Sequence, residues 1–119
     1  MKRTLTALAV FALLVAAAPI AGADAGTWSG EVLDLACYVA QDAKGEDHAG
    51  CAKNCVKGGQ PMGLLAEDGT VVLLAADHSD GAPYEALKDW AGEMVEISGE
   101  LTERDGVKVV KVTDSKASG

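Results

Sequence analysis

Short apolar stretches separated by turn residues follow one another along most of the chain. Stretches with alternating or uninterrupted apolar residues predict β-strands. Two pairs of them flank an Asp-Gly dipeptide, which is a strong signal for a tight hairpin, and Gly30 within the first stretch indicates a bulge or a sharp bend. Five strands are therefore predicted, at residues 27–35, 62–66, 71–75, 94–101 and 107–112.

Two helices are predicted between these strands. The first begins with Asp47 as its N-cap and runs to about Lys57, where two glycines and a proline end it. The second begins at Pro83, which suits a first helical position, and runs to about Trp90. The polar residues 41–47 are expected to form an exposed loop.

The element order is strand, helical insert, strand, strand, helix, strand, strand, and it resembles the OB-fold, a small five-stranded Greek-key barrel. The resemblance covers residues 28–112, and its most specific part is the closing hairpin M-V-E-I-S-G-E-L-T-E-R-D-G-V-K-V-V-K-V. We therefore expect a mainly β, five-stranded OB-like barrel. The cysteine-bearing helical insert between strands one and two departs from the usual OB pattern, and residues 113–119 are expected to fray.

Residues 1–25 have the pattern of a signal peptide. Lys2 and Arg3 precede an apolar run, and Ala23-Asp24-Ala25 is a small-x-small cleavage site, with cleavage after Ala23 as the nearest alternative. The apolar run is short for a membrane span. The sequence thus predicts an exported protein, periplasmic or secreted, whose residues 26–119 form a single domain without a membrane span.

The charge balance restricts the partners. The whole chain has a formal charge of −8, and removing Lys2, Arg3 and Asp24 with the signal peptide makes it −9. A domain this acidic is repelled by phosphate backbones and by anionic membranes. Nucleic acid is therefore not an expected partner.

The candidate chemistry lies in the insert, which holds all three cysteines and one of the two histidines. In the predicted helix, His48, Cys51 and Cys55 fall at positions i, i+3 and i+7 and share one face. Cys37 would reach them from the preceding segment. Three thiols and one imidazole make a Cys3His set, which predicts one transition metal ion, zinc or copper, in a structural or metal-handling role. For copper(I), Met62 would be a further soft ligand, although methionine more often fills a core.

Two alternatives account for the same residues. An exported protein with three cysteines often pairs two of them, so the first alternative is a bridge from Cys37 to Cys51 or Cys55 in a disulfide-stapled module that binds a protein or small ligand. A Cys51–Cys55 bridge within one helical turn would be strained. The cysteine face could also be an ordinary buried helix face.

Catalysis has little support in the sequence, and we do not predict an enzyme. Thiol redox chemistry at Cys51 and Cys55 is the one enzymatic interpretation considered. Asp34, three residues before Cys37, is expected to be solvated or to cap a helix, with orientation of His48 through a hydrogen bond as the alternative. His78, in a polar loop, is expected to be exposed, with a lesser role as an alternative ligand.

The pattern W-x-G-x-V-x-D-x-x-C, followed by H-x-x-C-x-x-x-C-V, a G-L-L strand and an OB-like ending, resembles small exported bacterial proteins of an uncharacterised family. The positions of this chain that match the pattern are Cys37, His48, Cys51 and Cys55. The resemblance implies the same fold and the same four-residue constellation. It implies no reaction.

Overall fold

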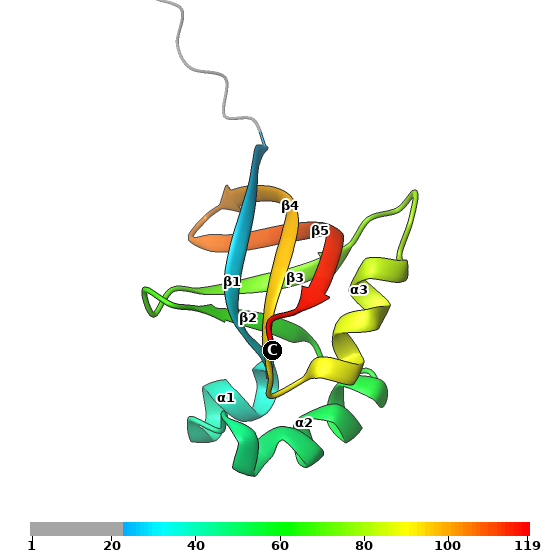
Figure 1. Ribbon diagram of the computed structural model, residues 1–119. Coiled ribbons are helices and arrows are strands. Elements are labelled where there is room, and N and C mark those ends of the chain that lie inside the picture. Colours follow the sequence, from blue (N-terminus) through cyan, green and yellow to red (C-terminus); the bar gives the residue numbers. More distant parts are fainter. Residues whose placement is uncertain (1–22) are drawn as a thin grey trace, which may run out of the picture.

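Five strands close into a barrel in the computed structural model, which describes residues 23–119 (Figure 1). The order around the barrel is β1-β2-β3-β5-β4, with β1 paired to both β2 and β4. Every pairing is antiparallel except β3 with β5, which is parallel. The predicted OB-like barrel is therefore confirmed. The strands are β1 (Asp24–Asp34), β2 (Met62–Ala66), β3 (Val71–Ala76), β4 (Met94–Arg104) and β5 (Val107–Ala117).

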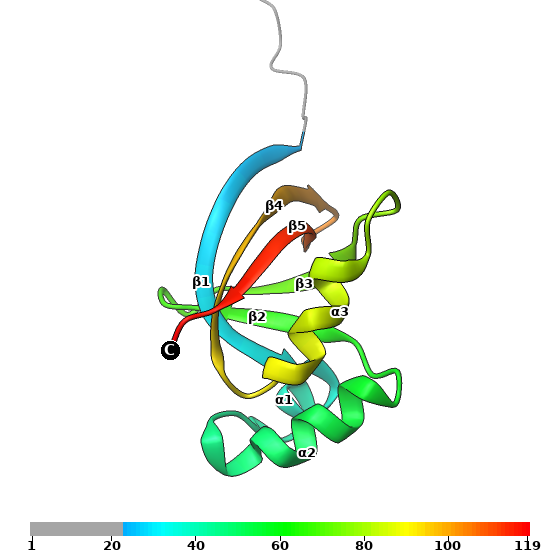
Figure 2. The same cartoon turned by 45° about the vertical axis from the view of Figure 1, so that its right-hand side comes forward.

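Helices occupy the two connections in which the sequence predicts them. The insert between β1 and β2 forms α1 (Leu35–Gln41) and α2 (Glu46–Lys57), and the connection from β3 to β4 forms α3 (Ala82–Ala86) and the 3-10 turn η1 (Leu87–Trp90). Figures 1 and 2 show α1 and α2 together beyond one end of the barrel, whereas α3 lies along its side against β3 and β5. The insert is thus an addition to the barrel's end.

The start of the insert differs from the prediction. The loop predicted at residues 41–47 is present but shorter, at residues 42–45, because α1 extends to Gln41 and ends at Asp42 in a left-handed conformation (φ 54°), and α2 begins at Glu46. The N-cap of α2 is Gly45, and Asp47 lies in the first turn. An acidic side chain there interacts favourably with the helix dipole without capping the helix. The predicted end at Lys57 is confirmed.

The expected fraying of residues 113–119 is wrong. Strand β5 continues to Ala117, which pairs with Val95, and the N–H of Ser118 donates to the carbonyl of Met94 at 2.9 Å. The first half of β4 supplies backbone partners for this segment, so its polar side chains point outward while its backbone is paired.

Gly30 marks the point where β1 is shared between two neighbours. It pairs with Ala66 of β2 and also with Val95 of β4. A Cβ atom there would collide with the carbonyl of Leu65, so only glycine allows this close approach. The glycine predicted to bend the strand therefore lies where the strand passes from one neighbour to the other.

The core fills the barrel and contains few residues of the insert. Ala52 and Val56, one turn apart on α2, are the two core residues that the insert supplies. Met62 is fully buried, as expected of a core methionine. Trp28 and Trp90 are half-buried against the cluster. The core consists of Val32, Ala52, Val56, Met62, Leu64, Val72, Leu74, Leu87, Ala91, Val95, Ile97, Val110 and Val112.

Helix α2 is fixed against the segment that leads into β4. Gly92 (φ 82°) lies so close to Ala49 that a Cβ atom on Gly92 would collide with it. Two ion pairs lie farther along the helix: Lys53 with Glu93 at 3.0 Å, and Lys57 with Asp89 at 2.6 Å. The close contact thus places the first turn of α2 against the barrel, and the ion pairs join its later turns to the same segment.

The predicted signal peptide lies almost entirely outside the described residues. Asp24 and Ala25, its last two residues, belong to β1 and pair with Leu101 and Glu100. Among residues 23–119, no helix is long and apolar enough to cross a membrane.

Candidate metal centre

Three potential metal ligands of different chemistry meet where β1 runs into the insert. A carboxylate oxygen of Asp34, the sulfur of Cys37 and an imidazole nitrogen of His48 all lie within 4.8 Å of one another. Asp34 is buried, and the other two are half-buried. The group is compact enough for one ion to contact all three residues after small side-chain adjustments.

Asp34 holds the first half of this group in place. It is the last residue of β1 and the N-cap of α1, and its Oδ1 accepts hydrogen bonds from the N–H groups of Ala36 at 3.1 Å and Cys37 at 3.3 Å. This is the usual role of aspartate at a helix start. Because the cap fixes the backbone of Cys37, the same residue positions the thiol.

His48 comes from the other helix. It lies in the first turn of α2, where its N–H donates to the carbonyl of Gly45 at 3.1 Å. The next residue is Ala49, which contacts Gly92. The imidazole is therefore carried by a turn of α2 that packs directly against the segment leading into β4.

Two atoms of the group have unmet polar interactions. Within the described part of the chain, Oδ2 of Asp34 and Nε2 of His48 are the two buried side-chain polar atoms that have no hydrogen-bond partner. Leaving such atoms unpaired in a protein interior costs free energy, so each calls for an explanation. A cation between the carboxylate, the imidazole and the Cys37 sulfur would satisfy both atoms at once.

Cys51 and Cys55 lie one turn apart on α2, close to the group. Interaction with the nearby Asp34 carboxylate is the largest cause that raises the pKa of the Cys55 thiol, to about 12, followed by burial and by interactions with Cys51. Cys55 is half-buried, and Cys51 is exposed. Both thiols are therefore near the centre but differ in their access to solvent.

The pKa values of Asp34 and Cys37 show how the two residues interact. Interaction with Asp34 is the main cause that raises the pKa of the Cys37 thiol, with further contributions from burial and from the charge of Cys51. Burial raises the pKa of Asp34, but the nearby thiols of Cys37 and Cys55 and the backbone N–H groups of Cys37 and Ala36 outweigh it, and the pKa is lowered from its ordinary value. The site thus holds a carboxylate anion beside protonated thiols. A bound cation would displace the thiol protons and leave the carboxylate ionised.

The structure brings together part of the predicted set and adds a residue to it. Cys37 and His48 are in the group of three, and Cys51 and Cys55 adjoin it without belonging to it. The prediction that Asp34 caps a helix is confirmed, and its second oxygen lies beside His48 without a hydrogen bond to it. The spacing of three residues between Asp34 and Cys37 was the available signal, since an aspartate that caps a helix lies close to the third residue of that helix.

The disulfide alternative finds no support in residues 23–119, which include every cysteine of the chain. All three cysteines are free thiols. His78 is exposed and belongs to no group of potential ligands found among the described residues, and Met62 is in the barrel core.

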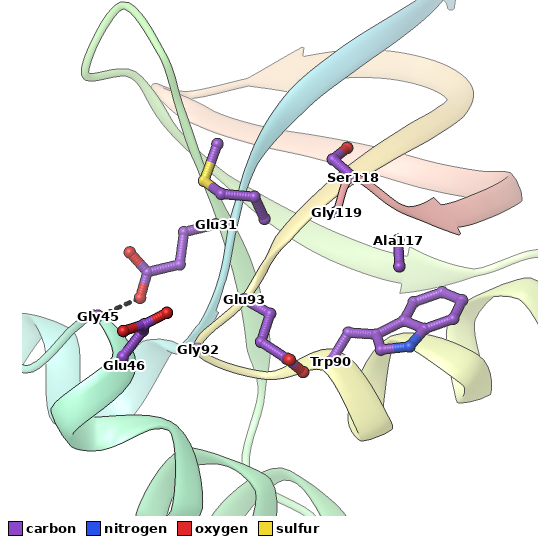
Figure 3. A pocket seen from close by; sticks show the side chains of 10 residues that line it. Glu31, Gly45, Glu46, Trp90, Gly92, Glu93, Ala117, Ser118 and Gly119 are labelled. Atoms are coloured by element: carbon purple, nitrogen blue, oxygen red, sulfur yellow. Dashed lines mark hydrogen bonds between the residues drawn. The ribbon is translucent and has the colours of Figure 1, made fainter.

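A separate cavity of about 510 Å³ lies beside the start of α2 (Figure 3). Figure 3 shows the carboxylates of Glu31, Glu46 and Glu93 around it, with the ring of Trp90 at one side. Glu31 accepts a hydrogen bond from the N–H of Gly45, and Glu93 pairs with Lys53. Two of these carboxylates therefore already hold the insert against the barrel.

Comparisons of the chain with protein-family models, with curated proteins and with solved structures give no match. The resemblance to small exported bacterial proteins therefore stays a prediction, and the function has to be inferred from the site.

Proposed function

We propose that this protein is a small exported domain that binds one transition metal ion at Asp34, Cys37 and His48. The observation that carries the proposal is the pair of buried, unpartnered atoms, Asp34 Oδ2 and His48 Nε2, beside the Cys37 sulfur. A hydrogen bond between protein groups would satisfy such atoms in an ordinary core. Here the group that lies beside the two residues is the Cys37 thiol, which is itself a potential metal ligand.

The mixed donor set favours zinc. One oxygen, one sulfur and one nitrogen suit a borderline divalent ion, whereas copper(I) prefers sulfur donors. The carboxylate of Asp34 remains ionised because its pKa is lowered, so it contributes a full negative charge to a divalent ion. Zinc therefore ranks ahead of the copper ion that the cysteine count alone also allowed.

Cys55 is the best candidate for a fourth ligand. It is half-buried, and the interaction of its thiol with Asp34 is strong enough to dominate its pKa. A metal ion that takes the place of the thiol proton would keep the sulfur beside the carboxylate. Asp34, Cys37, His48 and Cys55 would then complete a tetrahedral site.

The position of the site favours metal handling over a structural role for the whole fold. The barrel core takes only Ala52 and Val56 from the insert, and neither is a ligand. Loss of the ion would therefore loosen the connection between α1 and α2 and leave the barrel closed. This differs from small zinc domains whose core does not form without metal.

The test is native mass spectrometry of the purified protein, with and without a chelator. One zinc ion per chain, lost with the chelator, is the expected result. Asp34→Asn, Cys37→Ser and His48→Gln each change a direct ligand, so each should reduce zinc affinity by at least the roughly 10- to 100-fold typical of losing an outer partner. His78→Gln, which changes an exposed histidine elsewhere, is the matched control.

The same spectra identify the competing account. A protein without metal whose denatured mass is two hydrogens below the reduced mass would contain a disulfide, and the proposal would then fail. Equal zinc content in His48→Gln and His78→Gln would remove His48 from the site.

A further inference from the structure

The insert offers more ligands than one zinc ion needs. A tetrahedral site uses four donors, and Asp34, Cys37, His48 and Cys55 supply them. Cys51 is the fifth, and it is the exposed one among the three cysteines. A closed structural site is complete with four ligands, so the exposed Cys51 thiol is not needed to hold the ion.

We infer that Cys51 is the exchange ligand through which the ion enters and leaves the site, so that the protein passes zinc to and from thiol-bearing partners. The inference rests on the proposed metal site and adds to it the ligand through which the ion is exchanged. The partners it implies are zinc complexes of accessible thiolates, which deliver or accept the ion by ligand exchange.

The arrangement of the thiols supports this role. Cys51 lies three residues after His48 and four before Cys55 on α2, so it shares one helix face with two proposed ligands. It is the exposed thiol on that face. An incoming molecule can therefore reach Cys51 from solvent, at the edge of the site, while the barrel stays closed.

The two sides of the site are anchored unequally. The α2 side is held by the Gly92 contact, by the Lys53 and Lys57 ion pairs, and by two core residues. Helix α1, which carries Cys37, has seven residues and buries none of them. Segments with few buried contacts open at low free-energy cost. Cys37 is therefore the ligand that can withdraw while α2 keeps its place.

The exchange step needs no electron transfer. A bond forms between the ion and the Cys51 sulfur, and the thiol proton passes to water. The bond to Cys37 then breaks, and its thiolate takes up a proton. A thiolate of the accepting molecule next displaces Cys51 and the remaining ligands in the same manner. The ion keeps its charge throughout, and every proton released is returned to a sulfur or to solvent.

The experiment measures zinc transfer from the zinc-loaded protein to an excess of the chromogenic chelator 4-(2-pyridylazo)resorcinol by stopped-flow absorbance, together with equilibrium zinc affinity. Cys51→Ser should slow transfer about tenfold and should change the affinity much less than Cys37→Ser does. Asn54→Ser, another exposed position on α2, is the control and should transfer zinc at the wild-type rate.

Each result is decisive. An unchanged transfer rate in Cys51→Ser overturns the inference and leaves the metal site standing. An affinity loss in Cys51→Ser as large as that in Cys37→Ser makes Cys51 a permanent ligand and also overturns it. If the wild-type protein binds no zinc, the proposed function fails first, and the inference fails with it.

Discussion

Asp34 and Cys37 are joined by a hydrogen bond that uses only one of the two carboxylate oxygens. Oδ1 accepts from the Cys37 N–H at 3.3 Å, while Oδ2 is buried without a partner. Asn keeps an oxygen that can cap α1 but loses the charge. Asp34→Asn should therefore retain the helix cap and lose zinc affinity, whereas Asp34→Ala should also lose about 1 kcal/mol of stability.

Thermal melts of the metal-free variants separate the two functions of this residue. Asp34→Asn should melt close to the wild-type protein, and Asp34→Ala should melt lower. If Asp34→Asn binds zinc as tightly as the wild type, the second oxygen is not a ligand.

The stability of the metal-free protein should fall at alkaline pH. Cys55 has a folded-state pKa raised from 9.0 to about 12, so its contribution to stability is present below about pH 9 and is lost as the pH rises toward 12. Denaturant melts between pH 8 and 11 should show this decline. Cys55→Ser should show a shallower one, because serine does not titrate in this range.

A steeper or equal decline in Cys55→Ser would contradict the pKa shift. Zinc should remove the dependence in the wild-type protein, since the coordinated thiol is already deprotonated.

Met62 tests whether the core and the metal centre are separate. The side chain is fully buried in the barrel core, so Met62→Ala should cost about 2–5 kcal/mol in the free energy of unfolding. Zinc stoichiometry under native conditions should not change. Met94→Ala, at a position that is 45% exposed, is the control and should have a small effect. Loss of metal in Met62→Ala while the barrel stays folded would make Met62 a ligand.

The contact between Gly92 and Ala49 should transmit a barrel mutation to the metal centre. Gly92→Ala combines an unfavourable φ of 82° with a collision against α2, at a cost of about 1–3 kcal/mol for the overpacking alone. Gly69→Ala has nearly the same φ, 86°, but meets open space. Chemical denaturation should show the larger loss in Gly92→Ala, and calorimetric titration should show weakened zinc binding in that variant alone.

Removal of zinc should affect the protein locally. We expect faster amide hydrogen exchange in α1 after chelation, because this helix buries no residue and its Cys37 would lose a ligand bond. The strands of the barrel should keep their protection. Exchange that accelerates equally in β4 and β5 would show that the ion stabilises the whole fold.

The barrel was predictable because its signals are local. The Asp105-Gly106 turn has two positive φ angles, 52° and 84°, which is the geometry that such a dipeptide favours between two strands. The burial of Val95 and Ile97 likewise follows from their alternation along β4. Strand ends were less accurate, because Ala117 is held by backbone pairing that its own side chain does not signal.

The metal centre was only partly predictable because its geometry depends on two helices meeting. The i, i+3, i+7 pattern indicated that His48 and two cysteines share a face, but it did not show that His48 turns toward Asp34 and Cys37. Helix α1 was missed, since its seven residues are almost all apolar, so no polar face marks a helical period, and its start depends on a cap. The unpaired Oδ2 of Asp34 is a property of the packed structure.

Asp34 and Met62 are paired neighbours on β1 and β2, so the insert leaves and re-enters the barrel at adjacent backbone positions. Everything between them could in principle be exchanged for a tight turn without altering the strand order. The ligands would travel with the excised segment, apart from Asp34 at its boundary. Residues 34–62 therefore form a continuous segment that contains all the proposed ligands and begins and ends on paired strands. Grafting this segment onto another antiparallel hairpin would transfer the whole donor set.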